Sequence, residues 1–231
     1  MRHTPRVPTP RRFQALVDSH PGADWKLIDS AAKEEIQAAL LPAQDYVCAY
    51  CERPLRWAGG PFRETPEKTE HLVSTLHIEH FHPQNPDSNV PCMIHPSDYS
   101  PHLDWENLLA VCDGNKGDCC DGKLSNPTLA RCGQLLHPSD LAEGRWFTCN
   151  AKGEIEVARS CPDPVRAELT KNLLGLNCKR LVRLRENARK TAAGELKRLR
   201  EASYPRAVIA PMLRHEMRKH GLYTTIDSVL S

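Results

Sequence analysis

The sequence has no apolar run that approaches the roughly 18–20 residues a membrane-spanning helix needs. Its first 13 residues are basic but lead into no apolar stretch, which excludes a secretory signal peptide. Internal repeats and long low-complexity tracts are also missing. We therefore expect a cytoplasmic protein that has no membrane partner.

The chain does have enough apolar material for a core, since 40% of its 231 residues are hydrophobic. That length suits one domain of ordinary size, or a small domain with helical extensions. The net charge of +2 hides a segregation of charge. Residues 1–13 carry four arginines and no acid, and residues 165–202 carry eleven Lys or Arg against four Glu. Such segregation favours a polyanionic partner, although a solvated helix face is the simpler explanation of a charge run alone.

Local patterns predict helices towards both ends of the chain and strands in the middle. Residues 1–23 are rich in Pro and Arg and indicate an extended arm, and residues 24–41 indicate a helix that Pro42 ends. The strand candidates are residues 76–81, residues 105–112 and the two sides of a hairpin over residues 145–157.

The C-terminal third has a long helical pattern. Pro164 begins it with Asp163 as the N-cap, Gly175 divides it, and Pro205 closes it. We expect an α+β fold with three regions: an arm and helix at residues 1–45, a central domain at residues 46–160, and a basic helical region at residues 161–231.

Ten cysteines are many for a chain without a signal peptide, and they favour metal binding over disulfides. Cys48 and Cys51 alone have the CxxC spacing. A second pair is available from Cys112 together with Cys120, with Cys119 as the rival of Cys120. Four thiolates of this kind predict a closed, structural Zn²⁺ site.

Glu79 and His80 form a carboxylate–imidazole pair at the end of a predicted strand. They are either surface polar residues or the ligand and general base of a site that holds a hard cation such as Mg²⁺ or Mn²⁺. The second ligand would be Asp121 or Asp113. Asn107 is either a side-chain clamp on the loop that presents His80 or an ordinary strand-edge residue.

Four segments in this order resemble the HNH endonuclease superfamily, whose core is a ββα-metal motif. They are CAYC (48–51), HIEHFHP (77–83), WENLLAVC (105–112) and CCDGK (119–123). A closer resemblance covers most of the chain. With the DW at residue 24 and an LGLN stretch from residue 174, the chain is similar to the PtuB-like HNH proteins of Septu and retron-associated anti-phage systems.

This resemblance implies a ββα-metal core with a four-cysteine zinc site, embedded in mostly helical extensions. It implies DNA cleavage in the bacterial cytoplasm as part of phage defence. His80 would be the general base, Glu79 and Asp121 would bind the catalytic Mg²⁺ or Mn²⁺, and Asn107 would orient the site. The implied partner is a PtuA-like ATPase, and the resemblance leaves open whether a retron reverse transcriptase with its DNA is a further partner.

We expect the DNA backbone to be bound without sequence readout by the arginine-rich arm and the basic helix. The residues expected to contact it are Lys123, Arg180 and Arg183. The chain departs from the family where the Cys-Asp-x-x-Lys-Gly element is one residue short, at residues 120–123. Two other hypotheses stay open: a non-catalytic zinc module that binds DNA or protein, and an RNA-cleaving HNH effector.

Overall fold

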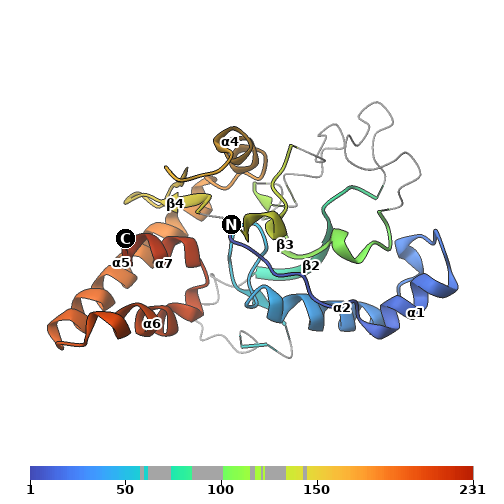
Figure 1. The fold of residues 1–231 in the computed structure, drawn as a ribbon, viewed down its shortest axis with the longest axis horizontal. Coiled ribbons are helices and arrows are strands. Elements are labelled where there is room, and N and C mark those ends of the chain that lie inside the picture. Colours follow the sequence, from blue (N-terminus) through green and yellow to red (C-terminus); the bar gives the residue numbers. More distant parts are fainter. Residues whose placement is uncertain are drawn as a thin grey trace.

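The computed structural model describes residues 1–57, 60–61, 74–84, 101–114, 118–120, 122, 134–142 and 145–230. It has the expected mixed α+β architecture (Figure 1). The predictions made for Asp121 and Lys123 lie outside the described residues. Within these ranges, no helix is both long and apolar enough to cross a membrane.

The helices are α1 (Arg11–Ser19), α2 (Ser30–Ala43), α4 (Pro164–Leu173), α5 (Lys179–Glu201), α6 (Arg206–Met217) and α7 (Tyr223–Leu230). The strands are β1 (Leu55–Arg56), β2 (Ser74–His80), β3 (Leu108–Cys112), β4 (Phe147–Cys149) and β5 (Ile155–Val157). Single 3₁₀ turns lie at Trp25–Leu27, Trp105–Asn107, Pro138–Ala142 and Arg218–His220.

A three-stranded sheet occupies the middle of the molecule (Figure 1). β2 pairs antiparallel with β3 and parallel with the short β1. All five residues of β3 are buried, as expected of an apolar central strand. The register places His80 opposite Leu108 at one end of the β2–β3 pair and Cys112 opposite Leu76 at the other. The two predicted sites therefore lie at opposite ends of the same two strands.

The helix predicted over residues 24–41 is present but has different bounds. Asp29 caps α2 by accepting a hydrogen bond from Ala32 N at 2.7 Å. The residues before it form only the 3₁₀ turn Trp25–Leu27. Pro42 lies inside α2 and does not end it, because a proline in the last turn removes a single intrahelical hydrogen bond.

The prediction of an extended arm over residues 1–23 is wrong in part. Residues 11–19 form α1, and its Phe13 is fully buried 5.8 Å from the Trp105 ring, measured between ring centres. The residues before α1 pack along the body of the protein. Thr4 N donates to Pro138 O at 3.1 Å, and Trp105 Nε1 donates to Val7 O at 2.7 Å. The spacing of Phe13 and Leu16 was the available signal for this helix.

The β4–β5 hairpin and the helices after it follow the predicted pattern. Gly153 in the hairpin turn has a φ of +86°, and a Cβ there would lie 2.3 Å from Val182 O on α5. Only glycine allows this approach. Asp163 caps α4 by accepting from Arg166 N at 3.0 Å, and Gly175, with a φ of +58°, separates α4 from α5.

Helix α5 contributes to two hydrophobic clusters. Leu181, Leu184 and Ala188 join the main core, which also contains residues of α2, β3 and the cysteine-bearing segments. Further along, Leu196 and Leu199 pack with α6 and α7 in a second cluster. Figure 1 shows α5, α6 and α7 together at one end of the molecule, with α1 at the other end.

Candidate functional site

Four cysteine side chains meet at one end of the β2–β3 pair. The Sγ atoms of Cys48, Cys51, Cys112 and Cys120 all lie within 4.8 Å of one another, and all four residues are buried. Cys48 Sγ is 3.9 Å from Cys120 Sγ, and Cys51 Sγ is 3.7 Å from Cys112 Sγ. These four cysteines can hold a metal ion, as the sequence predicts.

Tight backbone turns bring the two pairs together. Glu52 N donates to Cys48 O at 3.0 Å, and the positive φ of Glu52, 63°, turns the chain back after Cys51. Cys120 N donates to Leu174 O at 2.8 Å, which ties the second pair to the end of α4. Contact with Cys112 is the main cause that raises the pKa of Cys120. A bound cation would reverse this effect, because thiolates are the ligating form.

The choice between Cys119 and Cys120 follows from their side chains. Cys119 Sγ donates to Gly114 O at 3.7 Å and does not belong to the group of four. Gly114 has a φ of +63°, and a Cβ there would lie 2.3 Å from Cys119 O. This turn presents Cys120 to the other three thiols.

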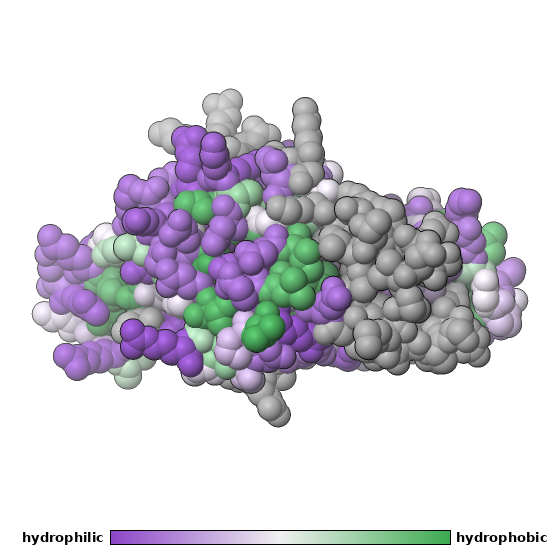
Figure 2. Space-filling view, turned by 90° about the horizontal axis from the view of Figure 1, so that it is seen from above, coloured by the Kyte–Doolittle hydropathy of each residue, from purple (hydrophilic) through white to green (hydrophobic). Residues whose placement is uncertain are grey.

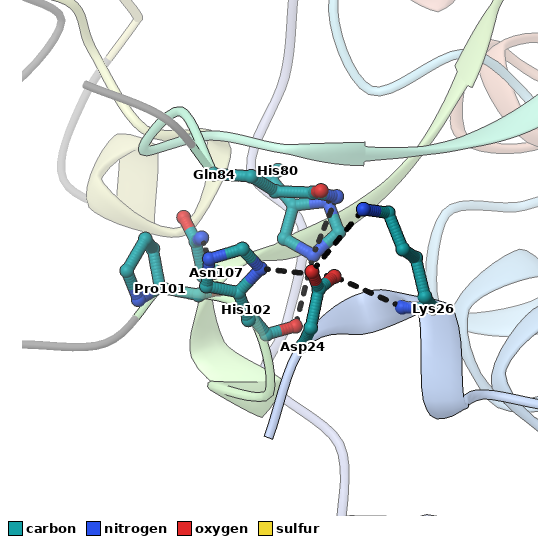
Figure 3. Close-up of polar contacts among 7 residues, drawn as sticks. All are labelled: Asp24, Lys26, His80, Gln84, Pro101, His102 and Asn107. Carbon is teal, nitrogen blue, oxygen red and sulfur yellow. Dashed lines mark hydrogen bonds and ion pairs between the residues drawn. The ribbon is translucent and has the colours of Figure 1, made fainter. Parts of the chain in front are cut away.

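His80 lies at the opposite end of β2 and is only 5% exposed. Its Nε2 is 3.0 Å from His102 O, and its Nδ1 is 2.9 Å from Gln84 Nε2 (Figure 3). A carbonyl oxygen only accepts, so Nε2 carries the hydrogen and the lone pair is on Nδ1. The Trp25 ring stands edge-on to His80, with ring centres 4.7 Å apart. Burial lowers the pKa of His80 and keeps its imidazole neutral.

A polar network behind His80 was not foreseen from the sequence. Asp24 Oδ1 is 3.7 Å from His102 Nδ1, and His102 is the residue whose carbonyl holds His80 (Figure 3). Asp24 also accepts from Lys26 N at 3.0 Å, which is the main reason that its pKa is lowered. The available signal was the DW at residue 24, which the family resemblance includes without a role.

Asn107 has the geometry of a clamp on the chain that follows β2. It is 1% exposed. Its Oδ1 accepts from His82 N at 2.6 Å, and its Nδ2 donates to His82 O at 3.1 Å and Pro101 O at 2.9 Å. Asn107 O accepts from Phe81 N at 2.9 Å. The two residues after His80 are therefore fixed through Asn107.

The carboxylates predicted as ligands are only partly placed. Glu79 is 8% exposed and lies opposite Leu109. Asp113 accepts from Ser74 Oγ at 3.0 Å, at the far end of β2. Asp113 is four positions after Leu109, which is about 13 Å along a strand. Asp113 therefore lies with the cysteines and away from Glu79.

Much of the predicted DNA-binding charge has partners inside the protein. In the N-terminal residues, Arg2 pairs with Asp45, Arg6 with Glu106, and Arg12 with Asp29. On α5, Arg185 is buried and donates to Leu176 O, and Arg189 donates to Cys149 O and Ser228 O, each at 3.2 Å. Of the two α5 arginines named from the sequence, Arg183 is exposed and Arg180 is half-buried.

Compared with known proteins, the chain matches no family model and no curated protein. The site is therefore interpreted from its own geometry. Within the described parts of the chain, the cysteine cluster is the one group of three or more His, Cys, Asp or Glu ligands that are close enough to hold a metal. At the other end of the strands, the His80 ring is held between His102 O at Nε2 and Gln84 Nε2 at Nδ1.

Proposed function

We propose that this protein is a metal-dependent endonuclease of the HNH type that hydrolyses phosphodiester bonds in DNA. In this proposal it is the effector of a bacterial anti-phage complex with a PtuA-like ATPase. The observation that carries the proposal is the fixed His80 imidazole, next to Glu79 and clamped through Asn107. The resemblance of the HIEHFHP and WENLLAVC segments to HNH proteins supports the same reading.

In the proposed reaction, His80 Nδ1 takes a proton from the attacking water. Gln84 donates to this atom in the structure, so the water would replace the Gln84 amide at Nδ1. The carbonyl of His102 holds the opposite ring nitrogen and stabilises the imidazolium that forms. By the resemblance to HNH proteins, Glu79 and Asp121 would hold Mg²⁺ or Mn²⁺, which supplies Lewis acidity to the phosphate when bound. Two carboxylates suffice, because Mg²⁺ keeps several of its waters.

The cysteine cluster would hold a structural Zn²⁺. Four buried thiols fill the four positions of a tetrahedral site and leave none for substrate. The ion would join Cys48 and Cys51 to Cys112 and Cys120, and so fix β3 at its end away from His80. Binding of zinc would then contribute directly to folding.

Plasmid cleavage tests the proposal. Supercoiled plasmid is incubated with the protein and Mg²⁺ or Mn²⁺, alone and together with the ATPase, beside a matched RNA substrate. His80→Ala should cut roughly 10²–10⁴ times more slowly than the wild type, the usual size of a general-base contribution. His77→Ala is the matched control, since it removes an imidazole from the same strand, and it should cut at nearly the wild-type rate. Equal cutting by His80→Ala and the wild type would refute the role of His80 as general base. Preferential cutting of RNA would mean that RNA, and not DNA, is the substrate.

A non-catalytic zinc module is the second candidate. The observation that favours it is the burial of His80, which is 5% exposed as a residue and whose Nδ1 is in contact with Gln84 Nε2. A wild-type protein that binds one Zn²⁺ per chain and binds DNA, but cuts nothing with either metal or with the ATPase, would support this candidate.

A further inference from the structure

A groove of about 700 Å³ lies between the end of α5 and the start of α6. Its floor includes Leu196 and Ile209, which belong to the second hydrophobic cluster. Arg200, Tyr204 and Arg206 also line it. We call this feature the α5–α6 groove. It lies at the end of the molecule away from α1 (Figure 1), where Figure 2 shows a hydrophobic patch among hydrophilic side chains.

The α5–α6 groove carries the positive charges of Arg200 and Arg206. No carboxylate lines it among the residues that the structure describes. Arg200 and Arg206 are exposed, and their guanidinium groups make no hydrogen bond or ion pair within the described ranges. Arg198 on the same helix is different, since it binds both carboxylate oxygens of Glu195.

An aromatic face lies beside these two cations. Tyr204 is 43% exposed, one of the few large hydrophobic side chains that are exposed to this extent. A smaller groove of about 390 Å³ shares Leu196 and Arg200 with the first and extends along α5 to Arg189. The twelve residues from Arg189 to Arg200 span about 16 Å of helix. The apolar surface is therefore a track and not a single point. Its cationic part is the α5–α6 groove, since Arg189 donates to Cys149 O and Ser228 O and Glu201 lines the smaller groove.

We propose that the α5–α6 groove binds a nucleic acid strand, with Arg200 and Arg206 on phosphates and Tyr204 stacked against a base. A guanidinium fork matches two phosphate oxygens, and a base can stack on an exposed ring whatever its sequence. An acidic peptide would use the two cations but leave the Tyr204 face without a matching group. The choice of DNA as ligand rests on the proposed function. The groove adds affinity at a distance from His80 and takes no part in the chemistry.

Binding of a fluorescein-labelled single-stranded 20-mer, followed by anisotropy without Mg²⁺ or Mn²⁺, tests this site. The double variant Arg200→Gln/Arg206→Gln should lose two phosphate contacts. The plot of log association constant against log salt concentration, which falls with salt, should then become less steep by about 1.4. Tyr204→Ala should weaken binding roughly fivefold or more. Arg198→Gln is the matched control, because it removes the same charge from the same helix where that charge already has a partner. It should bind within about twofold of the wild type.

All these side chains are exposed, so unchanged thermal melting will show that the variants are folded. Equal binding and equal salt slopes for the double variant and Arg198→Gln would overturn the proposal. So would an acidic peptide that competes with the DNA while Tyr204→Ala has no effect, since that result indicates a protein partner. The assay involves no cleavage. If the protein binds DNA through this groove but cuts nothing, the binding site is supported and the proposed nuclease activity is refuted.

Discussion

Replacing Asn107 with alanine should lower both the stability of the protein and its rate of cleavage. A control variant that loses the same number of hydrogen bonds elsewhere should lower the stability alone. The change removes three side-chain hydrogen bonds, two to His82 and one to Pro101. At about 1 kcal/mol net for each bond, the loss is roughly 3 kcal/mol of unfolding free energy. That corresponds to a fall in Tm of about 6–12 °C for a chain of this size.

Gln44→Ala is the matched control for this prediction. Gln44 is 2% exposed and also makes three hydrogen bonds: to Val47 O at 3.0 Å, to Ala110 O at 2.7 Å and from Ala110 N at 3.0 Å. Its loss should cost a similar free energy, because the number of buried bonds is the same. It bonds the middle of β3 at Ala110, and none of these three bonds is to the chain after His80.

Chemical denaturation gives the two stabilities, and cleavage at a temperature where both variants are folded gives the rates. Asn107→Ala should cut about 10² times more slowly than the wild type, because a displacement near 1 Å is worth that much at a reacting centre. Gln44→Ala should keep nearly the full rate. The same cleavage rate for both variants would refute the proposal that Asn107 positions the chain after His80. An unchanged stability of Asn107→Ala would refute the estimate of about 1 kcal/mol for each hydrogen bond.

Three further predictions concern metal and pH. Cys48→Ser should lose one bound Zn²⁺ per chain by metal analysis and yield less folded protein, whereas Cys161→Ser, also buried, should keep the metal. The lowered pKa of His80 should keep cleavage level from pH 8 to below pH 6.5, and a decline centred at or above 6.5 would contradict this. Burial lowers the pKa of His137 to about 3, so the unfolded chain takes up this proton first as the pH falls. The free energy of unfolding is therefore highest above pH 6.5 and falls as the pH drops, by about 2 kcal/mol at pH 5 from this group. Denaturation curves of His137→Asn should show a smaller fall.

The elements that could be predicted from the sequence are those with a local signal. Apolar residues indicated β2 and β3, although the first three residues of the strand predicted over residues 105–112 form a 3₁₀ turn. The N-cap Asp163 and the break at Gly175 bound the C-terminal helices as expected. The CxxC spacing led to the full group of four cysteines, and a second pair was required to complete a tetrahedral set. Geometry then preferred Cys120 to Cys119 through one turn.

The parts that could not be predicted depend on partners distant in sequence. The N-terminal arginines looked free because nothing in residues 1–13 is acidic, yet Arg2 pairs with Asp45 and Arg6 with Glu106. A count of charge along the chain cannot show which charges the fold brings together. The same holds for Trp25 beside His80, since 55 residues separate two rings that the fold places in contact.

This redistribution of charge bears on where a polyanion would bind. Exposed ion pairs such as Arg12–Asp29 stabilise a fold only slightly, but they reduce the field that a phosphate would meet. Arg200 and Arg206 make no ion pair within the described parts of the chain, although Glu201 lines the smaller groove that Arg200 shares. If the basic arm bound DNA as the sequence suggests, Arg2→Gln and Arg200→Gln would weaken binding alike. The structure favours a larger effect at Arg200, since the phosphate would not have to displace a carboxylate there.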